Sequence, residues 1–214
     1  MQILKQELKD KIRIEAKKAF LMNGFEKASM RGIAKESGTT VGNVYRYFKN
    51  KDALYLEVVN EAYDAIMHIM NVNHSKNIDF NRTDSVRPDY DIVIDPVLNS
   101  IVDVFITYRQ EIRILMACSE GSKFESVRKK FGVMVVDKIY NEIFADIDNR
   151  YMDLKVLSTS LANTCIDGIT RVCNSDMSDE EMHRNIYGLM VYLFHGAHTR
   201  LSIIEERVKG EINE

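Results

Sequence analysis

The sequence has little of what interrupts helices or spans membranes. Its 214 residues include only two prolines and ten glycines, so long stretches remain in which helices can run without interruption. It contains no run of 18 apolar residues, and therefore we expect no transmembrane helix. It also lacks any sustained alternation of apolar and polar residues that would indicate strands. These absences predict an all-α protein.

The sequence contains only three cysteines, and their spacing matches no paired-cysteine motif. Cys118, Cys165 and Cys173 form no Cys-x-x-Cys motif, and their odd number and wide spacing argue against a disulfide framework. The segment Met1 to Lys11 is charged and has no apolar core, which is not typical of a signal peptide. We therefore expect a cytoplasmic protein in a reducing compartment.

Motifs of catalysis and metal binding are also missing. The sequence has no glycine-rich phosphate loop and no His-Glu-x-x-His, and the Ser-x-Gly-Ser of residues 119–122 lacks the strand-turn-helix context of a nucleophile elbow. His195 and His198 have a spacing compatible with one metal ion, but no cysteine or carboxylate nearby in sequence completes a ligand set. We therefore predict no catalytic residues, no metal site and no cofactor, and we do not expect an enzyme.

What the chain does have is an uneven charge distribution and enough apolar residues for a core. The net charge is −3, and 45% of the residues are hydrophobic. Residues 1–55 hold 12 lysines and arginines against 6 acidic residues, whereas residues 56–214 hold 17 against 26. A basic N-terminal part on an acidic remainder is typical of a protein that binds nucleic acid through one domain.

The stretch from Ser29 to Leu54 has the pattern of a helix-turn-helix followed by a third helix. Ser29 is a good N-cap for a first short helix, Gly38 can end it in the left-handed conformation, and Thr40 can cap the next helix. The apolar residues of the motif, which we expect to point inward, are Ile33, Ala34, Val44 and Phe48. The polar residues left facing outward are Arg31, Thr39, Thr40, Asn43, Arg46 and Tyr47. A short helix of this kind fits the major groove of DNA, and Gly42 would let its backbone approach closely.

These residues resemble the DNA-binding domain of the TetR family of bacterial transcriptional regulators (TetR/AcrR type). The resemblance covers about a quarter of the chain with its spacing intact. The matching positions are Ser29, Ile33, Ala34, Ser37, Gly38, Thr39, Thr40, Gly42, Val44, Tyr45, Tyr47, Phe48, Lys51 and Leu54. The departures from the family pattern are Ser29 for Thr, Ser37 for Ala, Thr39 for Val, Thr40 for Ser, Val44 for Leu and Tyr47 for His.

The resemblance implies a DNA-binding surface within this motif. The implied DNA-binding residues are Ser29, Arg31, Thr39, Thr40, Val41, Gly42, Asn43, Tyr45, Tyr47 and Lys51. Ser29, Thr40, Tyr47 and Lys51 match phosphate-contacting positions, and Arg31, Val41 and Asn43 match positions that can reach bases. Arginine reads guanine and asparagine reads adenine. Two alternatives stay open: Arg31 contacts phosphate only, and Tyr45 only packs.

The resemblance also implies two domains and about nine helices. Residues 1–52 would form a three-helix DNA-binding domain, and residues 53–214 a larger helical domain for effector binding and dimerisation. From the apolar spacing we expect helices over residues 6–23, 52–70, 96–108, 112–116, 124–147, 153–174 and 178–208, with an irregular segment at 71–95. Ser178 and Glu181 predict a capping box at the start of the last helix.

Family members commonly bind a small effector in the larger domain and dimerise through their last two helices. We interpret as pocket residues Met67, Met70, Phe105, Tyr108, Met116, Cys118, Phe131, Met134 and Cys165, although core packing is the competing role of each. We interpret as dimer-interface residues Gly168, Tyr187, Gly188, Val191, Phe194, His195 and His198.

The implied function is a repressor that binds a pseudo-palindromic operator as a homodimer and is released by a small, largely apolar effector. Three alternatives remain: an activator, a DNA-binding regulator without an effector, and an all-α enzyme.

Overall fold

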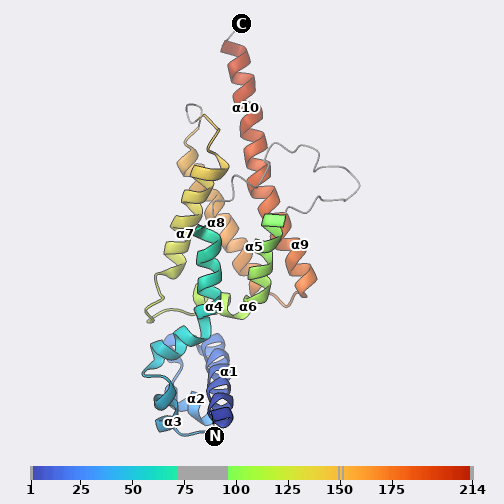
Figure 1. The fold of residues 1–214 in the computed structure, drawn as a ribbon. Helices are drawn as coiled ribbons and strands as arrows, with labels where there is room; N and C mark the ends of the chain where they lie inside the picture. The colour runs from blue at the N-terminus through green and yellow to red at the C-terminus, as the bar shows by residue number, and fades with distance from the viewer. Residues whose placement is uncertain (1, 72–95, 149, 151, 213–214) are drawn as a thin grey trace. The chain divides into compact units, whose positions relative to one another are not determined.

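The computed structural model describes residues 2–71, 96–148, 150 and 152–212, and every regular element in these ranges is helical. The predicted all-α class is confirmed. The helices are α1 (Gln2–Lys27), α2 (Met30–Glu36), α3 (Val41–Tyr47), α4 (Lys51–Asn71), α5 (Pro96–Thr107), α6 (Arg109–Ala117), α7 (Val127–Lys138), α8 (Leu154–Cys173), α9 (Asp179–Met190) and α10 (Gly196–Ile212) (Figure 1). Two π-helical turns extend α7 (Ile139–Ile143) and join α9 to α10 (Val191–His195), so the described residues form nine continuous helices.

The chain divides into two compact units. The head unit comprises Met1–Met67 and Tyr108–Arg128, and the body unit comprises His68–Thr107 and Lys129–Glu214. The domain boundary predicted from the sequence, between residues 52 and 53, remains a proposal. The predicted irregular segment lies almost wholly in residues 72–95, outside the described ranges.

The core of the head unit forms where α1 meets the helix-turn-helix and α4. Ile12, Ala16 and Phe20 recur at four-residue spacing on α1 and are fully buried, as the apolar stripe predicts. Gly24, with φ of 72°, breaks the helical path near the end of α1 and turns the chain toward α2. Phe25 follows and packs back against the ring of Phe20.

Residues 108–128 belong to the head unit because buried contacts tie them to α1 and α4. The Tyr55 hydroxyl donates a hydrogen bond to the Ile114 carbonyl over 3.1 Å, and the Phe25 N–H donates to the Cys118 carbonyl over 2.9 Å. The aromatic rings of Tyr55 and Phe124 lie 5.6 Å apart. Sequence periodicity does not reveal these contacts, because each joins residues that lie far apart along the chain.

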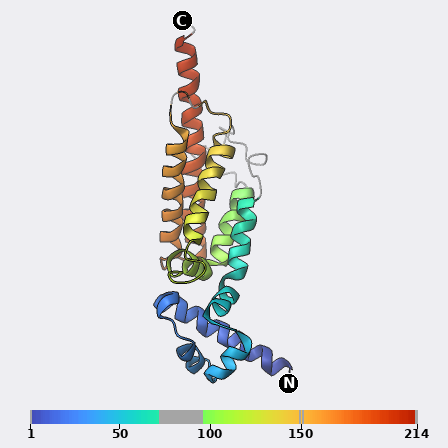
Figure 2. The same ribbon diagram turned by 90° about the vertical axis from the view of Figure 1, so that its left-hand side faces the viewer.

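In the body unit, α7, α8 and the α9–α10 helix run side by side in both ribbon views (Figures 1 and 2), and α5 packs on α9. Helices α8 and α9 approach closely at Gly168. A β-carbon at Gly168 would lie 2.4 Å from Cδ2 of Leu189, so glycine is required for this spacing unless Leu189 moves. The small residue therefore serves contact within the chain.

Helix α7 is shorter than the predicted helix over 124–147. Before it, the Ser122 hydroxyl donates to the Ser119 carbonyl and accepts from the Phe124 N–H, over 2.6 and 3.0 Å. Such local hydrogen bonds compete with helical ones and delay the helix until Val127. At its other end, the Phe144 N–H closes a π-turn on the Ile139 carbonyl, and regular helix does not resume.

Candidate nucleic-acid interface

Helix α2 is defined at both ends by the residues that the sequence predicts. The Ser29 hydroxyl accepts a hydrogen bond from the Gly32 N–H over 3.0 Å, which makes Ser29 the N-cap. At the other end Gly38 has φ of +67°, and the Thr39 N–H donates to the Ala34 carbonyl over 2.9 Å. This arrangement is a Schellman motif, and it fixes the turn that leads into α3.

Helix α3 has a capped N-terminus that carries the candidate base-reading residues. The Thr40 hydroxyl accepts a hydrogen bond from the Asn43 N–H over 3.3 Å. The Asn43 side-chain amide donates to the Thr39 hydroxyl over 3.1 Å, which orients it on the surface. Val44 is fully buried beneath, so the helix has one inward and one outward side. The predicted register of α3 is thus the observed one.

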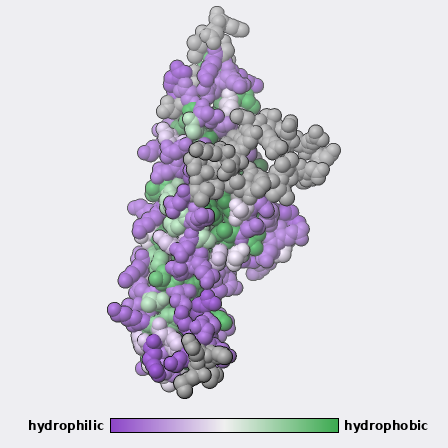
Figure 3. All heavy atoms as spheres, viewed as in Figure 1, coloured by the Kyte–Doolittle hydropathy of each residue, from purple (hydrophilic) through white to green (hydrophobic). Residues whose placement is uncertain are grey.

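The structure brings the predicted DNA-binding residues together on α2, α3, their caps and the start of α4. The exposed members are Ser29, Arg31, Thr40, Gly42 and Tyr45, and the half-buried members are Thr39, Val41, Asn43, Tyr47 and Lys51. Tyr45 keeps 49% of its surface exposed, so packing does not account for the whole ring. Hydrophilic residues predominate over this region on the face in Figure 3.

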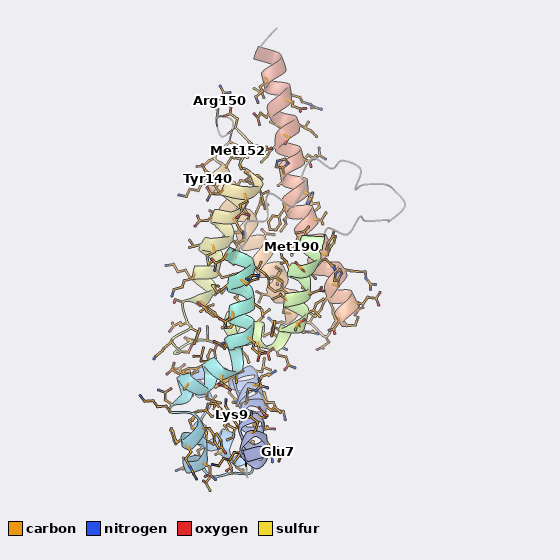
Figure 4. All side chains as sticks on the ribbon, viewed as in Figure 1. Glu7, Lys9, Tyr140, Arg150, Met152 and Met190 are labelled. Carbon is orange, nitrogen blue, oxygen red and sulfur yellow. The ribbon has the colours of Figure 1, made fainter. Side chains whose placement is uncertain are left out.

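Arg31 and Arg46 contribute positive charge to this surface. Both are exposed, and neither forms an ion pair with any residue that the structure describes. The sequence predicts that Arg46 faces outward, but the family resemblance assigns it no DNA contact. By contrast, Lys9 on α1 (Figure 4) pairs with Glu57 over 2.6 Å, which partly neutralises its charge.

Lys51 differs from the other candidates because its ammonium group is directed into the head unit. Its Nζ atom lies within hydrogen-bond distance of the backbone carbonyls of Phe25, Glu26 and Ala28. The proposed phosphate contact is therefore in competition with internal partners.

The candidate pocket residues are divided between the two units. Met67, Tyr108, Met116 and Cys118 belong to the head unit, and Met70, Phe105, Phe131, Met134 and Cys165 belong to the body unit. Phe105, Met116, Phe131 and Cys165 are buried core residues. Burial raises the pKa of the Cys165 thiol to about 12, so it remains protonated and unreactive at neutral pH.

A small surface hollow lies elsewhere in the body unit and contains none of the candidate pocket residues. Its lining residues are Ile147, Asp148, Met152, Leu154, Leu201, Ile204 and Glu205. Met152 and the neighbouring Arg150 lie in the connection between α7 and α8 (Figure 4). The Asp148 carboxylate pairs with Arg150, and this interaction lowers the pKa of Asp148.

Three of the seven proposed dimer-interface residues are already buried within one chain, and their place at a dimer interface remains a proposal. Tyr187, Phe194 and His198 keep 6%, 8% and 2% of their surface exposed. The His198 imidazole Nε2 lies 3.0 Å from a carboxylate oxygen of Asp146, inside the body unit. Because the apolar stripe on the last helix is wide, the sequence does not show which side of this helix packs within its own chain.

The remaining proposed dimer residues stay on or near the surface. Gly188 is exposed, Val191 and His195 are half-buried, and Gly168 contacts Leu189 of the same chain. Tyr192, which the sequence analysis did not select, is 79% exposed beside them. Among the described residues, no group of three or more histidine, cysteine, aspartate or glutamate side chains is placed to hold a metal ion.

Comparison with known proteins places the helix-turn-helix in a defined group. Residues 13–58 match the family model described as "Bacterial regulatory proteins, tetR family". The regulator QacR of Staphylococcus aureus is 43% identical over 53 residues, which are 25% of this chain and 28% of QacR. A further HTH-type transcriptional regulator from S. aureus strain USA300 is 28% identical over 164 residues, covering 73% of this chain and 80% of that protein.

Solved structures share the fold over most of the chain. NalD of Pseudomonas aeruginosa, the secondary repressor of the MexAB-OprM multidrug efflux pump, is 19% identical and has a TM-score of 0.56, covering 89% of this chain and 96% of NalD. MexZ, a repressor from the same organism, is 20% identical with a TM-score of 0.52, covering 88% of this chain and 95% of MexZ. No helix in the described residues is both long and apolar enough to cross a membrane.

Proposed function

Because the chain belongs to the TetR family of bacterial transcriptional regulators, we propose that it is a repressor that binds a pseudo-palindromic operator as a homodimer and is released by a small, largely apolar effector. Family members are DNA-binding regulators and not enzymes. The observation that carries the proposal is the capped helix α3, whose outward side presents Asn43 and Tyr45, while Arg31 is exposed on the contacting helix α2.

In this proposal α3 enters the major groove and its N-terminal residues meet base edges. Arg31 donates to guanine, and Asn43 reads adenine, each contributing about 1–3 kcal/mol of discrimination between bases. The Thr39 contact holds the Asn43 amide in place before DNA arrives, so less side-chain entropy is lost on binding. Ser29, Thr40 and Tyr47 would contact phosphates and fix the register of the head unit.

The homodimer is supported by a row of residues on the outward side of the last helix. Gly188, Tyr192, His195 and Thr199 follow one another at spacings of four, three and four residues. Space is open around Gly188, and Tyr192 offers a large exposed ring. A twofold copy covering this row would bury the aromatic ring, and two heads would then bind half-sites about 34–36 Å apart.

Selection of bound fragments from the host genome tests the proposed function. We expect the wild type to enrich a short inverted repeat whose half-site centres lie about one helical turn, or a multiple of one, apart. Asn43→Ala should relax the preference at one base of each half-site. Arg207→Ala, which removes an exposed cation on α10, is the control and should enrich the same repeat. Enrichment of unrelated fragments would reject specific operator binding.

The effector part of the proposal rests on the family and on the repressors of efflux systems that share the fold. A compound library screened by thermal unfolding would identify a ligand, because a molecule that binds only the folded state raises the melting temperature. A true effector must also release the protein from its operator at the same concentration. If no stabilising compound releases DNA, a regulator that responds to no small molecule becomes the better account.

A further inference from the structure

We propose that Lys51 is a positioning residue that braces the start of the helix-turn-helix from within, and that it makes no contact with DNA phosphate. The contacts of this brace exist in the free protein. Only their effect on DNA binding rests on the proposed function.

The Lys51 ammonium has a full set of internal partners. Its Nζ atom donates to the carbonyl oxygens of Phe25 over 2.7 Å, Glu26 over 3.0 Å and Ala28 over 3.1 Å. A lysine ammonium has three N–H donors and no acceptor, so these three bonds use all of them. Nothing remains to donate to a phosphate unless an internal bond breaks.

The ring of Phe25 gives the same ammonium a fourth contact. Nζ lies 4.3 Å from the centroid of that ring, well within the range of a cation–π interaction. The Phe25 ring is itself held edge-on by the Tyr55 ring at 5.2 Å. The contact therefore joins the first residue of α4 to the aromatic core of the head unit.

The carbonyls that Lys51 binds belong to the turn that follows the break at Gly24. Near the end of a helix the last carbonyls have no N–H four residues ahead to bond, and an outside donor must satisfy them. Lys51 provides that donor from 23 to 26 residues away along the chain. It thereby acts as a distant C-cap for the end of α1.

The position of Lys51 is otherwise unfavourable for a cation. It is the first residue of α4, where the helix dipole places partial positive charge. Three carbonyl oxygens and an aromatic face offset this repulsion. A lysine kept here for its charge alone would be better placed at the end of a helix.

The brace should affect DNA binding because the turn that Lys51 holds leads directly into α2. Ala28 precedes Ser29, the N-cap of α2, and Arg31 lies on the first turn of that helix. The Phe25 N–H is fixed from the other side by the Cys118 carbonyl. Releasing the turn would thus loosen α2 relative to α4 without removing any group that touches DNA.

Two readouts on Lys51→Met separate a brace from a phosphate contact, and Lys49→Met is the matched control because Lys49 is an exposed lysine two residues earlier. In the absence of DNA we expect Lys51→Met to lower the melting temperature by about 2–4 °C or more, and Lys49→Met to leave it unchanged. With operator DNA, Lys51→Met should weaken binding while the slope of log K against log salt stays at the wild-type value.

A phosphate contact gives the opposite pattern. Loss of one such contact lowers the magnitude of the salt slope by about one and leaves the melting temperature of the free protein unchanged. That result for Lys51→Met would overturn the brace.

A measurement on the wild type covers the case in which Lys51→Met fails to fold. Lysine acetylation of the DNA-free protein, mapped by mass spectrometry, should modify Lys51 at least tenfold more slowly than Lys49. Equal rates without DNA, with protection of Lys51 only on operator addition, would contradict the proposal. If the wild type binds no operator at all, the proposed function fails, but the melting and acetylation results still decide the role of Lys51.

Discussion

At the scale of single residues, backbone conformation at a few positions decides whether the DNA-reading surface exists. Gly38 has a positive φ that joins α2 to α3, and Gly24 has one that lets α1 end before α2. The sequence predicts both turns, since glycine beside a polar cap is a recognisable signal. It does not predict the partners of Lys51, because a lysine carries no local mark of where its flexible side chain will reach.

Replacing Gly38 tests the turn between α2 and α3. Gly38→Ala should lower the free energy of unfolding by about 1–2 kcal/mol, because a β-carbon is strained at φ near +67°. Gly38→Asn should lose less, since asparagine tolerates this conformation better. Chemical denaturation of both variants provides the comparison. Equal losses for the two variants would show that strain at this φ is not the cause.

At the scale of elements, contacts between distant segments complete the head unit. The amphipathic stripes of α1 and the last helix, the caps of α2 and α3, and the capping box of α9 follow from sequence patterns. The late start of α7 does not, because the Ser122 hydroxyl binds backbone groups that a helix would use. The hydrogen bond from the Tyr55 hydroxyl of α4 to the Ile114 carbonyl of α6 could not be predicted from periodicity.

Removing that hydroxyl measures the link between α4 and α6. Tyr55→Phe should lower the free energy of unfolding by about 0.5–1.5 kcal/mol, the usual net value of one hydrogen bond. The loss is moderate because the Ile114 carbonyl also accepts the Cys118 N–H. Tyr140→Phe, at a tyrosine that is 37% exposed, is the control and should be neutral. Equal stability of Tyr55→Phe and the wild type would exclude the link.

Tyr55 also makes the free energy of unfolding depend on pH in the alkaline range. Burial raises the pKa of its hydroxyl above the ordinary value of 10.0, so the folded state holds the proton more tightly than the unfolded state. The contribution of Tyr55 to the free energy of unfolding is therefore full below pH 10 and falls as the pH rises above 10. Unfolding measured across this range should show a shallower decline for Tyr55→Phe. The buried Cys165 titrates in the same direction and leaves a residual slope.

The capping box of α9 gives a matching test at acid pH. Hydrogen bonds from Ser178 lower the pKa of Glu181 below its ordinary value of 4.5. Its contribution is therefore complete above pH 4.5 and disappears as pH falls through the lower folded-state pKa. Glu181→Gln should retain the box at neutral pH but lose this acid dependence. Ser178→Ala should cost about 1 kcal/mol at neutral pH, measured by denaturation.

At the scale of the whole molecule, the proposal requires two copies acting together on DNA. Tyr187, Phe194 and His198 are buried within the body unit, and Tyr192 is the most exposed aromatic among the residues of this unit that the structure describes. The sequence could indicate that the last helix is apolar on a wide arc, but not which flank its own chain covers. That choice depends on where α5 and α8 pack.

Charge placed on this surface should separate the copies. If the wild type is a dimer in sedimentation velocity, as proposed, Tyr192→Asp should shift it to monomer, because two carboxylates would meet across a twofold interface. Val133→Asp, at an exposed valine of α7, should remain dimeric and controls for added charge. A Tyr192→Asp protein that sediments as the wild type would place the interface elsewhere.

The affinity for DNA upstream of the protein's own gene, measured at 50 and 200 mM salt, tests the central claim most directly. The account predicts binding at about 10⁻⁸–10⁻¹¹ M near physiological salt, a steep loss as salt rises, and weaker discrimination for Arg31→Ala but not for Arg207→Ala. If scrambled DNA of the same length binds equally well, and Arg31→Ala behaves like Arg207→Ala, then α2 and α3 do not read sequence on this DNA. If a genome-wide selection also yielded no preferred fragment, the account of this protein as a specific regulator would be contradicted.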